Sequence, residues 1–216
     1  AIYPRTTVWP KLPALGSQDG MPRPVPGQLT SRSDMPLGAG MGSSAAVVAA
    51  TIVLYEHLLG RPQSIEDRFQ KVRFCERLQH GKGSAIDASA VVFGGMNRVQ
   101  GDDVRQLSIA PEHSLARSDG WYWVLHGTPV SKTGECVAKV RAHHGQNAGL
   151  WEEFTTCTTA FEAVIADDSD PRDVIRENQR LLNFIGVTPT PTARFIAAVE
   201  ASGGAAKISG AGAVAG

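Results

Sequence analysis

Residues 36–46 read Pro-Leu-Gly-Ala-Gly-Met-Gly-Ser-Ser-Ala-Ala and lead directly into an apolar, alanine-rich run. The glycines at alternate positions, Gly38, Gly40 and Gly42, can adopt positive φ angles and bring backbone N–H groups close to an anion. The start of a helix also favours negative charge, because its first amides are unpaired and its dipole is positive there. The pattern predicts a phosphate-binding loop at the start of a helix, which is typical of nucleotide-using enzymes.

The same residues also fit a plain tight turn in which Ser43 or Ser44 caps the helix. Two other phosphate loops are excluded, since the glycines are followed by no Gly-Lys-Ser/Thr and do not have the Gly-x-Gly-x-x-Gly order. What remains resembles the second motif of the GHMP kinases, Pro-x-x-x-Gly-Leu-Gly-Ser-Ser-Ala, from which only Met41 departs.

The composition is that of an ordinary globular protein, because 216 residues with 42% hydrophobic content can bury the core of one large or two small domains. The 21 basic and 21 acidic residues form no long run of either sign, so no nucleic acid and no anionic membrane is expected as a partner. With no apolar stretch of membrane-spanning length and no recognisable signal peptide, a cytoplasmic location is expected. Cys75, Cys136 and Cys157 are expected to be reduced thiols in the packing.

Hydrophobic periodicity and capping residues predict helices over residues 44–59, 64–79, 133–144, 150–166, 171–184 and 192–201. Runs of β-branched and aromatic residues predict strands over residues 6–9, 28–35, 88–93, 96–99, 106–109, 121–126 and 205–209. The middle three of these strands read as a β meander, and the strand at 121–126 reads as buried. In the second helix, the buried stripe is expected to contain Phe69, Val72 and either Cys75 or Leu78.

Residues 76–87 read Glu-Arg-Leu-Gln-His-Gly-Lys-Gly-Ser-Ala-Ile-Asp and supply two carboxylates downstream of the glycine loop. Phosphoryl transfer needs a metal ion to neutralise the β- and γ-phosphates, and a carboxylate to orient the attacking hydroxyl or accept its proton. Glu76 and Asp87 can divide these two tasks. The alternative is that Glu76 is a solvated charge on a helix and that Asp87 is a turn or cap residue.

This segment resembles mevalonate kinase and its close relatives, in which a helical glutamate, a His-Gly and a Ser-Gly-x-Asp follow the glycine loop at the same spacing. The resemblance implies that Ser44 and Glu76 bind Mg²⁺ and that Asp87 is the catalytic aspartate. It also implies that His80 and Ser84 lie with Asp87 at the substrate, although a structural role beside the site fits His80 equally well.

Two further segments extend the resemblance toward the ATP phosphates. Thr133 matches a threonine near the γ-phosphate, although Thr133 or Ser131 can equally be a helix N-cap. Residues 207–212 match the beginning of the third motif, Lys-x-Thr/Ser-Gly-Ala-Gly-Gly-Gly, but residues 213–215 replace its later glycines and are expected to stiffen the loop. The ATP-binding set that the resemblance implies is Pro36, Gly38, Ala39, Gly40, Met41, Gly42, Ser43, Ser44, Ala45, Thr133, Ser209, Gly210, Ala211 and Gly212.

The fold that the resemblance implies is a two-domain α+β kinase. Residues 1–118 are expected to form an incomplete N-terminal domain with a left-handed βαβ unit, and residues 119–216 an incomplete C-terminal domain of helices and antiparallel sheet. The family's first motif, with a Pro-Gly-Lys and a Gly-Glu-His, has no counterpart before Pro36. The chain is therefore expected to be an internal fragment without a catalytic lysine, lacking the C-terminal end as well, and with little or no activity by itself.

The function that the resemblance implies is transfer of the γ-phosphate of ATP to an alcohol, with Mg²⁺ as cofactor and mevalonate, an isoprenoid precursor, as the expected substrate. Phosphomevalonate, homoserine and sugar kinases stay open as alternatives. So does a non-catalytic nucleotide- or metabolite-binding module, which the missing lysine and the altered third motif favour. Homodimers are common among the relatives, so a homodimer is also an expectation.

Overall fold

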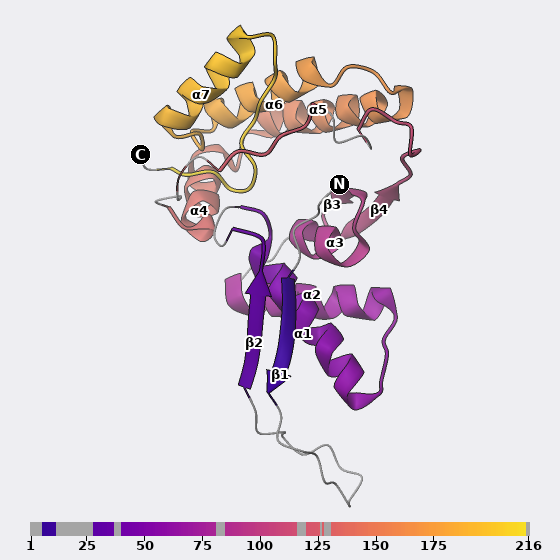
Figure 1. Ribbon diagram of the computed structural model, residues 1–216. Helices are drawn as coiled ribbons and strands as arrows, with labels where there is room; N and C mark the ends of the chain where they lie inside the picture. Colours follow the sequence, from indigo (N-terminus) through magenta and orange to yellow (C-terminus); the bar gives the residue numbers. More distant parts are fainter. Residues whose placement is uncertain are drawn as a thin grey trace, which may run out of the picture. The chain divides into compact units, whose positions relative to one another are not determined.

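The computed structural model describes residues 6–11, 28–36, 40–80, 85–115, 120–125, 127 and 131–214. These residues form two compact units (Figure 1). Unit 1 consists of the described residues within 1–37 and 42–107, and unit 2 consists of those within 38–41 and 108–216. The predicted α+β class is confirmed, whereas the domain boundary between residues 118 and 119 stays a prediction.

Unit 1 combines two hairpins with three helices. Its elements are β1 (Thr6–Lys11), β2 (Gln28–Ser33), α1 (Ser43–Leu59), α2 (Ile65–His80), α3 (Ala85–Phe93), β3 (Met96–Gln100) and β4 (Asp103–Leu107). Strands β1 and β2 pair antiparallel, and so do β3 and β4. A βαβ unit contains parallel strands, and the strands that the structure describes pair only antiparallel. The expected left-handed βαβ unit therefore stays a prediction.

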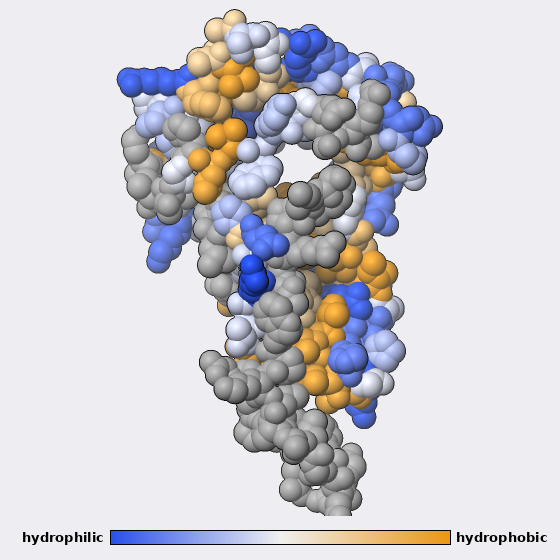
Figure 2. Space-filling model, viewed as in Figure 1, coloured by the Kyte–Doolittle hydropathy of each residue, from blue (hydrophilic) through white to orange (hydrophobic). Residues whose placement is uncertain are grey.

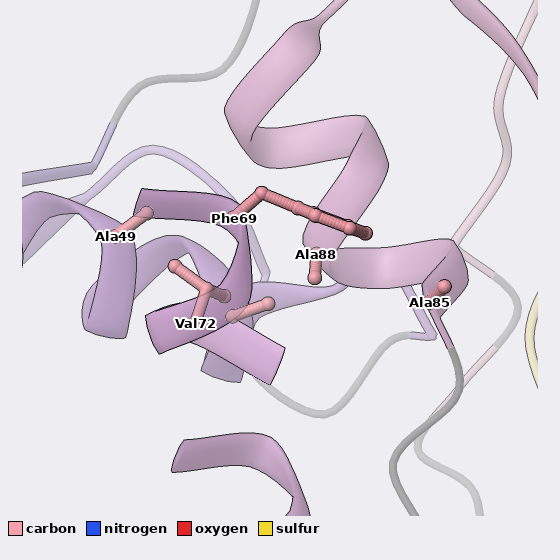
Figure 3. Packing of buried hydrophobic residues seen from close by; sticks show 6 residues of the cluster. Ala49, Phe69, Val72, Ala85 and Ala88 are labelled. Carbon is pink, nitrogen blue, oxygen red and sulfur yellow. The ribbon is translucent and has the colours of Figure 1, made fainter. Parts of the chain in front are cut away.

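The core of unit 1 lies where α1, α2 and α3 meet. Six buried apolar side chains form this core, and Figure 3 shows them at close range: Ala45, Ala49, Phe69, Val72, Ala85 and Ala88. The small alanines let the helices approach closely, and the Phe69 ring reaches from α2 toward Ala88 of α3 (Figure 3). This packing fixes the start of α1 and the start of α3 within one rigid cluster.

Helix α2 begins at the predicted capping residue. The backbone N–H of Asp67 donates to Ser64 Oγ at 3.0 Å, and the Ser64 hydroxyl donates to the Asp67 carboxylate at 2.7 Å. Phe69 and Val72 are buried as predicted. Of the two alternatives for the third position, Leu78 is wrong, because this side chain is 72% exposed, while Cys75 is half-buried. The helix also buries two charged residues, Arg73 and Glu76.

The segment predicted as a β meander is a helix followed by a hairpin. Residues 88–93 belong to α3, and the predicted strand at 106–109 corresponds to β4, which begins and ends earlier. The β-branched pair at residues 91–92 favours a strand, but burial of Ala85, Ala88 and Ser89 follows the helical spacing of three and four. Tertiary packing against α1 and α2 therefore overrides local propensity here.

Unit 2 is helical in its described residues. It contains α4 (Thr133–His144), α5 (Ala148–Asp167), α6 (Arg172–Phe184) and α7 (Thr190–Ala201), which match the predicted helices closely. The predicted strands at 121–126 and 205–209 are wrong, because the described residues in both segments have no strand structure. Trp123 is also 61% exposed, so the prediction of a buried strand fails on burial as well. A strand needs a hydrogen-bonded neighbour, and the described residues of unit 2 supply none.

Unit 2 has two apolar clusters. Leu150, Cys157 and Leu181 join α5 to α6, while Val187, Ile196 and Ile208 join α7 to the segment that follows it. Cys136 and Cys157 are buried free thiols, as predicted, and Cys75 is half-buried and also free. The second cluster holds residues 207–214 against the helices.

The surface of unit 1 carries several large hydrophobic side chains on α1 and α2. Val53, Leu59 and Phe74 are each exposed by more than two fifths, and Figure 2 shows such residues in orange among hydrophilic ones in blue. Single exposed apolar side chains are normal on soluble surfaces. Among the described helices, none has the length and apolarity that a membrane crossing requires.

An ion pair between a half-buried arginine and a buried carboxylate ties α1 to α2 and makes the stability of unit 1 depend on pH. Arg68 donates two hydrogen bonds to the Glu56 carboxylate, at 3.1 and 2.7 Å, and these hold the pKa of Glu56 below its ordinary value. The resulting stabilisation is complete above the unfolded-state pKa of about 4.3 and is lost as the pH falls through the lower folded-state pKa. We expect Glu56→Gln to remove this acid-side loss, measured by urea unfolding between about pH 3 and 6. An unchanged pH dependence in the variant would contradict this role.

Candidate active site

The glycine loop leads from β2 to α1. Pro36 lies after β2, while Gly38 and Ala39 lie outside the described residues. Gly40 and Gly42 have φ angles of 70° and 69°, in the left-handed region that glycine adopts most easily. Gly42 is the N-cap of α1 and has no side-chain capping bond, so the alternative of a serine N-cap is wrong. Met41 precedes this cap, and Ser43, Ser44 and Ala45 form the first turn of the helix.

Ser44 and Glu76 are brought together by the packing of α1 on α2. The Ser44 hydroxyl donates to Glu76 Oε1 at 2.8 Å, and the Glu76 side chain is only 5% exposed. A carboxylate this buried is not a solvated surface charge, so that alternative for Glu76 is wrong. A half-buried hydroxyl and a buried carboxylate thus lie side by side at the N-terminus of α1.

Asp87 lies beside the same helix start. A methyl group added at Gly42 would meet the Cβ, Cγ and Oδ1 atoms of Asp87 at 3.4 Å. Asp87 is exposed and belongs to the first turn of α3, where a negative charge complements the helix dipole. Unit 1 therefore gathers Ser44, Glu76 and Asp87 around Gly42, from three different helices.

The expected substrate residues are described only in part. His80 is the last residue of α2, and its side chain lies outside the described residues, as does the whole of Ser84. Both stay predictions.

Arg73 is a buried residue of this helix that sequence reasoning missed. Its side chain is 6% exposed, it stacks over the Phe69 ring at 5.5 Å, and it pairs with Asp102 in the β3–β4 turn. Arg73 precedes Glu76 by three residues and so shares its face of α2. Only the helical spacing from Phe69 and Glu76 could have marked it in the sequence.

In unit 2, the third-motif segment lies against the other end of the glycine loop. A Cβ added at Gly210 would lie 2.8 Å from the Cα of Gly40, and one at Gly40 would lie 2.9 Å from Ser209 O. Both approaches are closer than any side chain allows, so two glycine-rich backbones touch here. Ala211 and Gly212 follow, and the φ angle of Gly212 is 66°. Such a pair of loops offers backbone N–H groups to an anion.

The two departures from the third motif that the structure describes serve packing in unit 2. Ala213 is buried and its N–H donates to Val187 O at 2.9 Å, while Val214 packs on the cluster of Val187, Ile196 and Ile208. The predicted stiffening thus has a structural counterpart, but it lies after the two glycines with positive φ.

Thr133 begins α4, as predicted. The N-cap of this helix is Lys132, whose N–H donates to Glu135 Oε2 at 3.1 Å, so the alternative of Thr133 or Ser131 as N-cap is wrong. The Ser131 hydroxyl instead accepts from the Val214 N–H at 3.2 Å, joining the beginning of α4 to the third-motif segment. Thr133 itself stays a predicted phosphate contact.

The oxygen donors in unit 1 fit a magnesium ion. The described residues hold no cluster of three or more His, Cys, Asp and Glu that could bind a metal by themselves. Mg²⁺ is usually bound through one or two carboxylates together with substrate phosphates and waters, so a dedicated protein cage is not required. Glu76 and the Ser44 hydroxyl supply hard oxygen donors of this kind.

Comparison with known proteins assigns the fold to a family. The GHMP kinases N terminal domain matches residues 12–95, which contain the glycine loop, Ser44, Glu76 and Asp87. Residues 12–95 thus belong to the GHMP kinase N-terminal domain family. Among GHMP kinases the chain is similar to the mevalonate kinase of Archaeoglobus fulgidus, with 30% identity over 88% of this chain and 64% of that protein.

Other GHMP kinases match over a similar range. The mevalonate kinase of Thermococcus onnurineus is 28% identical over 83% of this chain and 55% of its own length. The phosphomevalonate kinase of a Streptomyces species is 31% identical over 80% of this chain and 54% of its own length. The chain thus spans between about half and two thirds of these relatives.

Solved structures confirm the GHMP kinase fold. The crystal structure of the Methanococcus jannaschii mevalonate kinase superposes with a TM-score of 0.70, covering 85% of this chain and 57% of that one at 18% identity. A second mevalonate kinase structure gives a TM-score of 0.64. At these identities the likeness establishes the fold alone.

Proposed function

We propose that this protein transfers the γ-phosphate of ATP to the hydroxyl of a small alcohol, and that the alcohol is mevalonate. The observation that carries the proposal is the hydrogen bond from Ser44 to the buried Glu76, with Asp87 beside the same helix start. A hydroxyl, a buried carboxylate and an exposed carboxylate at one helix N-terminus match the needs of phosphoryl transfer.

In this proposal the chain positions charges and accepts one proton. In unit 1, the N–H groups at the start of α1 hold phosphate oxygens. In unit 2, the backbone N–H groups of residues 209–212 are assigned to ATP phosphates by the family resemblance. The Asp87 carboxylate accepts the proton of the attacking hydroxyl as its oxygen bonds to the γ-phosphorus. The bond from that phosphorus to the bridging oxygen breaks, and ADP leaves. Catalysis then rests on orientation and charge complementarity.

Glu76 and Ser44 would hold the magnesium ion, which when bound neutralises the charge of the β- and γ-phosphates. The hydrogen bond between them keeps both oxygens at one place before any ligand arrives. Burial of Glu76 among helices α1, α2 and α3 prevents that carboxylate from turning out into water.

Mevalonate is the proposed alcohol because mevalonate kinases in several archaea match most of this chain. Phosphomevalonate is the second candidate, since the Streptomyces enzyme matches at 31% identity. Phosphomevalonate carries an added dianionic group, which needs cationic partners that mevalonate does not.

Replacement of Glu76 tests the metal part of the proposal. We expect Mg²⁺ to strengthen binding of a non-hydrolysable ATP analogue to the natural protein that carries these residues. Glu76→Gln should weaken this gain by at least about tenfold, because it removes a charged metal ligand. Isothermal titration with and without Mg²⁺ measures both affinities.

The matched control is Glu66→Gln, the same substitution at an exposed position of α2. We expect Glu66→Gln to retain the full Mg²⁺ effect. Nucleotide binding that ignores Mg²⁺ in the natural protein would favour a non-catalytic binding module instead.

A further inference from the structure

Residues 203–214 of unit 2 are hydrogen-bonded to the rest of the unit at both ends. The glycine-rich residues 209–212 lie between these two sets of hydrogen bonds. On the later side, Ala213 N–H donates to Val187 O, Val214 N–H donates to Ser131 Oγ, and Lys139 Nζ donates to Val214 O at 2.9 Å. On the earlier side, the N–H groups of Gly203 and Gly204 donate to Glu200 O and Val199 O of α7, and side chains of α6 bond the segment as well.

Three side chains on one face of α6 bond this segment in order. Arg172 and Arg176 donate to the carbonyl oxygens of Gly203 and Gly204, at 3.2 and 2.7 Å, and Gln179 accepts from the N–H of Ile208 at 2.9 Å. Their spacing of four and three residues places them along one side of the helix. Side chains on this face of α6 thus bond the segment from Gly203 to Ile208, the residue just before Ser209.

Gln179 differs from the two arginines in being fully buried, at 2% exposure. Its amide nitrogen donates to Asn183 Oδ1 at 2.7 Å and to Thr188 Oγ1 at 3.0 Å, so both N–H groups are used. A backbone N–H can only donate, so the amide oxygen must face Ile208. Every polar atom of the Gln179 side chain is therefore engaged, and its orientation is fixed.

We propose that Gln179 is a positioning residue for the phosphate-binding segment Ser209–Gly212, and that it acts through the N–H of Ile208 without touching the nucleotide. This inference rests on the proposed function, since it assigns ATP phosphates to that segment. The backbone of Gly210 lies so close to Gly40 that it has no space to move independently. A displacement of Ile208 therefore also displaces the backbone N–H groups of the residues that follow it.

The test is Gln179→Met, which keeps the length, volume and helix preference of the side chain but removes its hydrogen bonds. We expect the KM for ATP to rise by about tenfold while the KM for the alcohol stays unchanged. Hydrogen exchange at the amides of residues 208–210 should also become faster in the absence of ligands.

The matched control is Thr188→Val, which removes another bond of the same buried amide but leaves the contact with Ile208. We expect this variant to keep the ATP affinity and the exchange rates of the natural protein. Unchanged ATP affinity in Gln179→Met would overturn the positioning role. So would equal losses of ATP affinity in Gln179→Met and Thr188→Val, if these losses parallel the decrease in melting temperature. Failure of the natural protein to bind ATP would instead overturn the proposed function.

Discussion

Asp87→Asn should reduce the turnover number by about two to four orders of magnitude while ATP affinity stays close to that of the natural protein. Asparagine has the same shape as aspartate but cannot accept the proton of an attacking hydroxyl at neutral pH. Asp87 is exposed in the first turn of α3, a position that asparagine tolerates, so the variant should fold normally. Steady-state kinetics and ATP titration separate the two effects.

The matched control for this variant is Asp103→Asn, which makes the same change at an exposed position of β4 in unit 1. We expect Asp103→Asn to leave turnover unaffected. Comparable turnover in Asp87→Asn and the natural protein would remove Asp87 from the proposed mechanism. If ATP affinity falls by as much as turnover, Asp87 is a nucleotide contact instead.

Gly212→Ala should lower the free energy of unfolding of unit 2 by about 2 to 5 kcal/mol. Two costs add at this position. The φ angle of 66° is unfavourable for alanine, and the new Cβ would lie 2.0 Å from Val187 O. That oxygen also accepts the hydrogen bond from Ala213, so the clash and the anchor of the segment involve the same atom. Urea unfolding followed by circular dichroism measures the loss.

Gly186→Ala separates the two costs, because Gly186 has a similar φ angle of 75° but no neighbour within 4 Å of an added Cβ. Only the backbone cost of about 1 to 2 kcal/mol is then expected. Equal unfolding free energies for the two variants would show that the close approach to Val187 carries no cost.

The helices were predictable because their signals are local. Thr133–His144 was predicted to the residue, and Ser64 was identified as the cap of α2. Helix α3 was missed because its β-branched pair favours a strand, and only packing on α1 and α2 selects the helix. Residues 121–125 have strand composition, but a strand depends on a distant partner that a local pattern does not contain.

The candidate site also contains residues that the sequence predicted and one that it did not. Ser44, Glu76 and Asp87 could be proposed from spacing and resemblance, and the structure brings these three residues together. Gln179 could not be found, because nothing in the local sequence distinguishes a glutamine that is buried and bonded to a backbone N–H from one in solvent. The partner of Gln179, Ile208, lies far along the chain, so only the folded structure shows that the two residues are bonded.

We propose that these residues serve phosphoryl transfer from ATP to an alcohol. The most direct measurement follows ³¹P signals while the natural protein is incubated with ATP, Mg²⁺ and, in separate samples, mevalonate, phosphomevalonate, homoserine and galactose. We predict ADP and a new phosphate monoester with mevalonate, abolished by Asp87→Asn and retained by Asp103→Asn. A monoester formed only from another alcohol would correct the substrate, and ATP that stays intact with all four alcohols would contradict the claim.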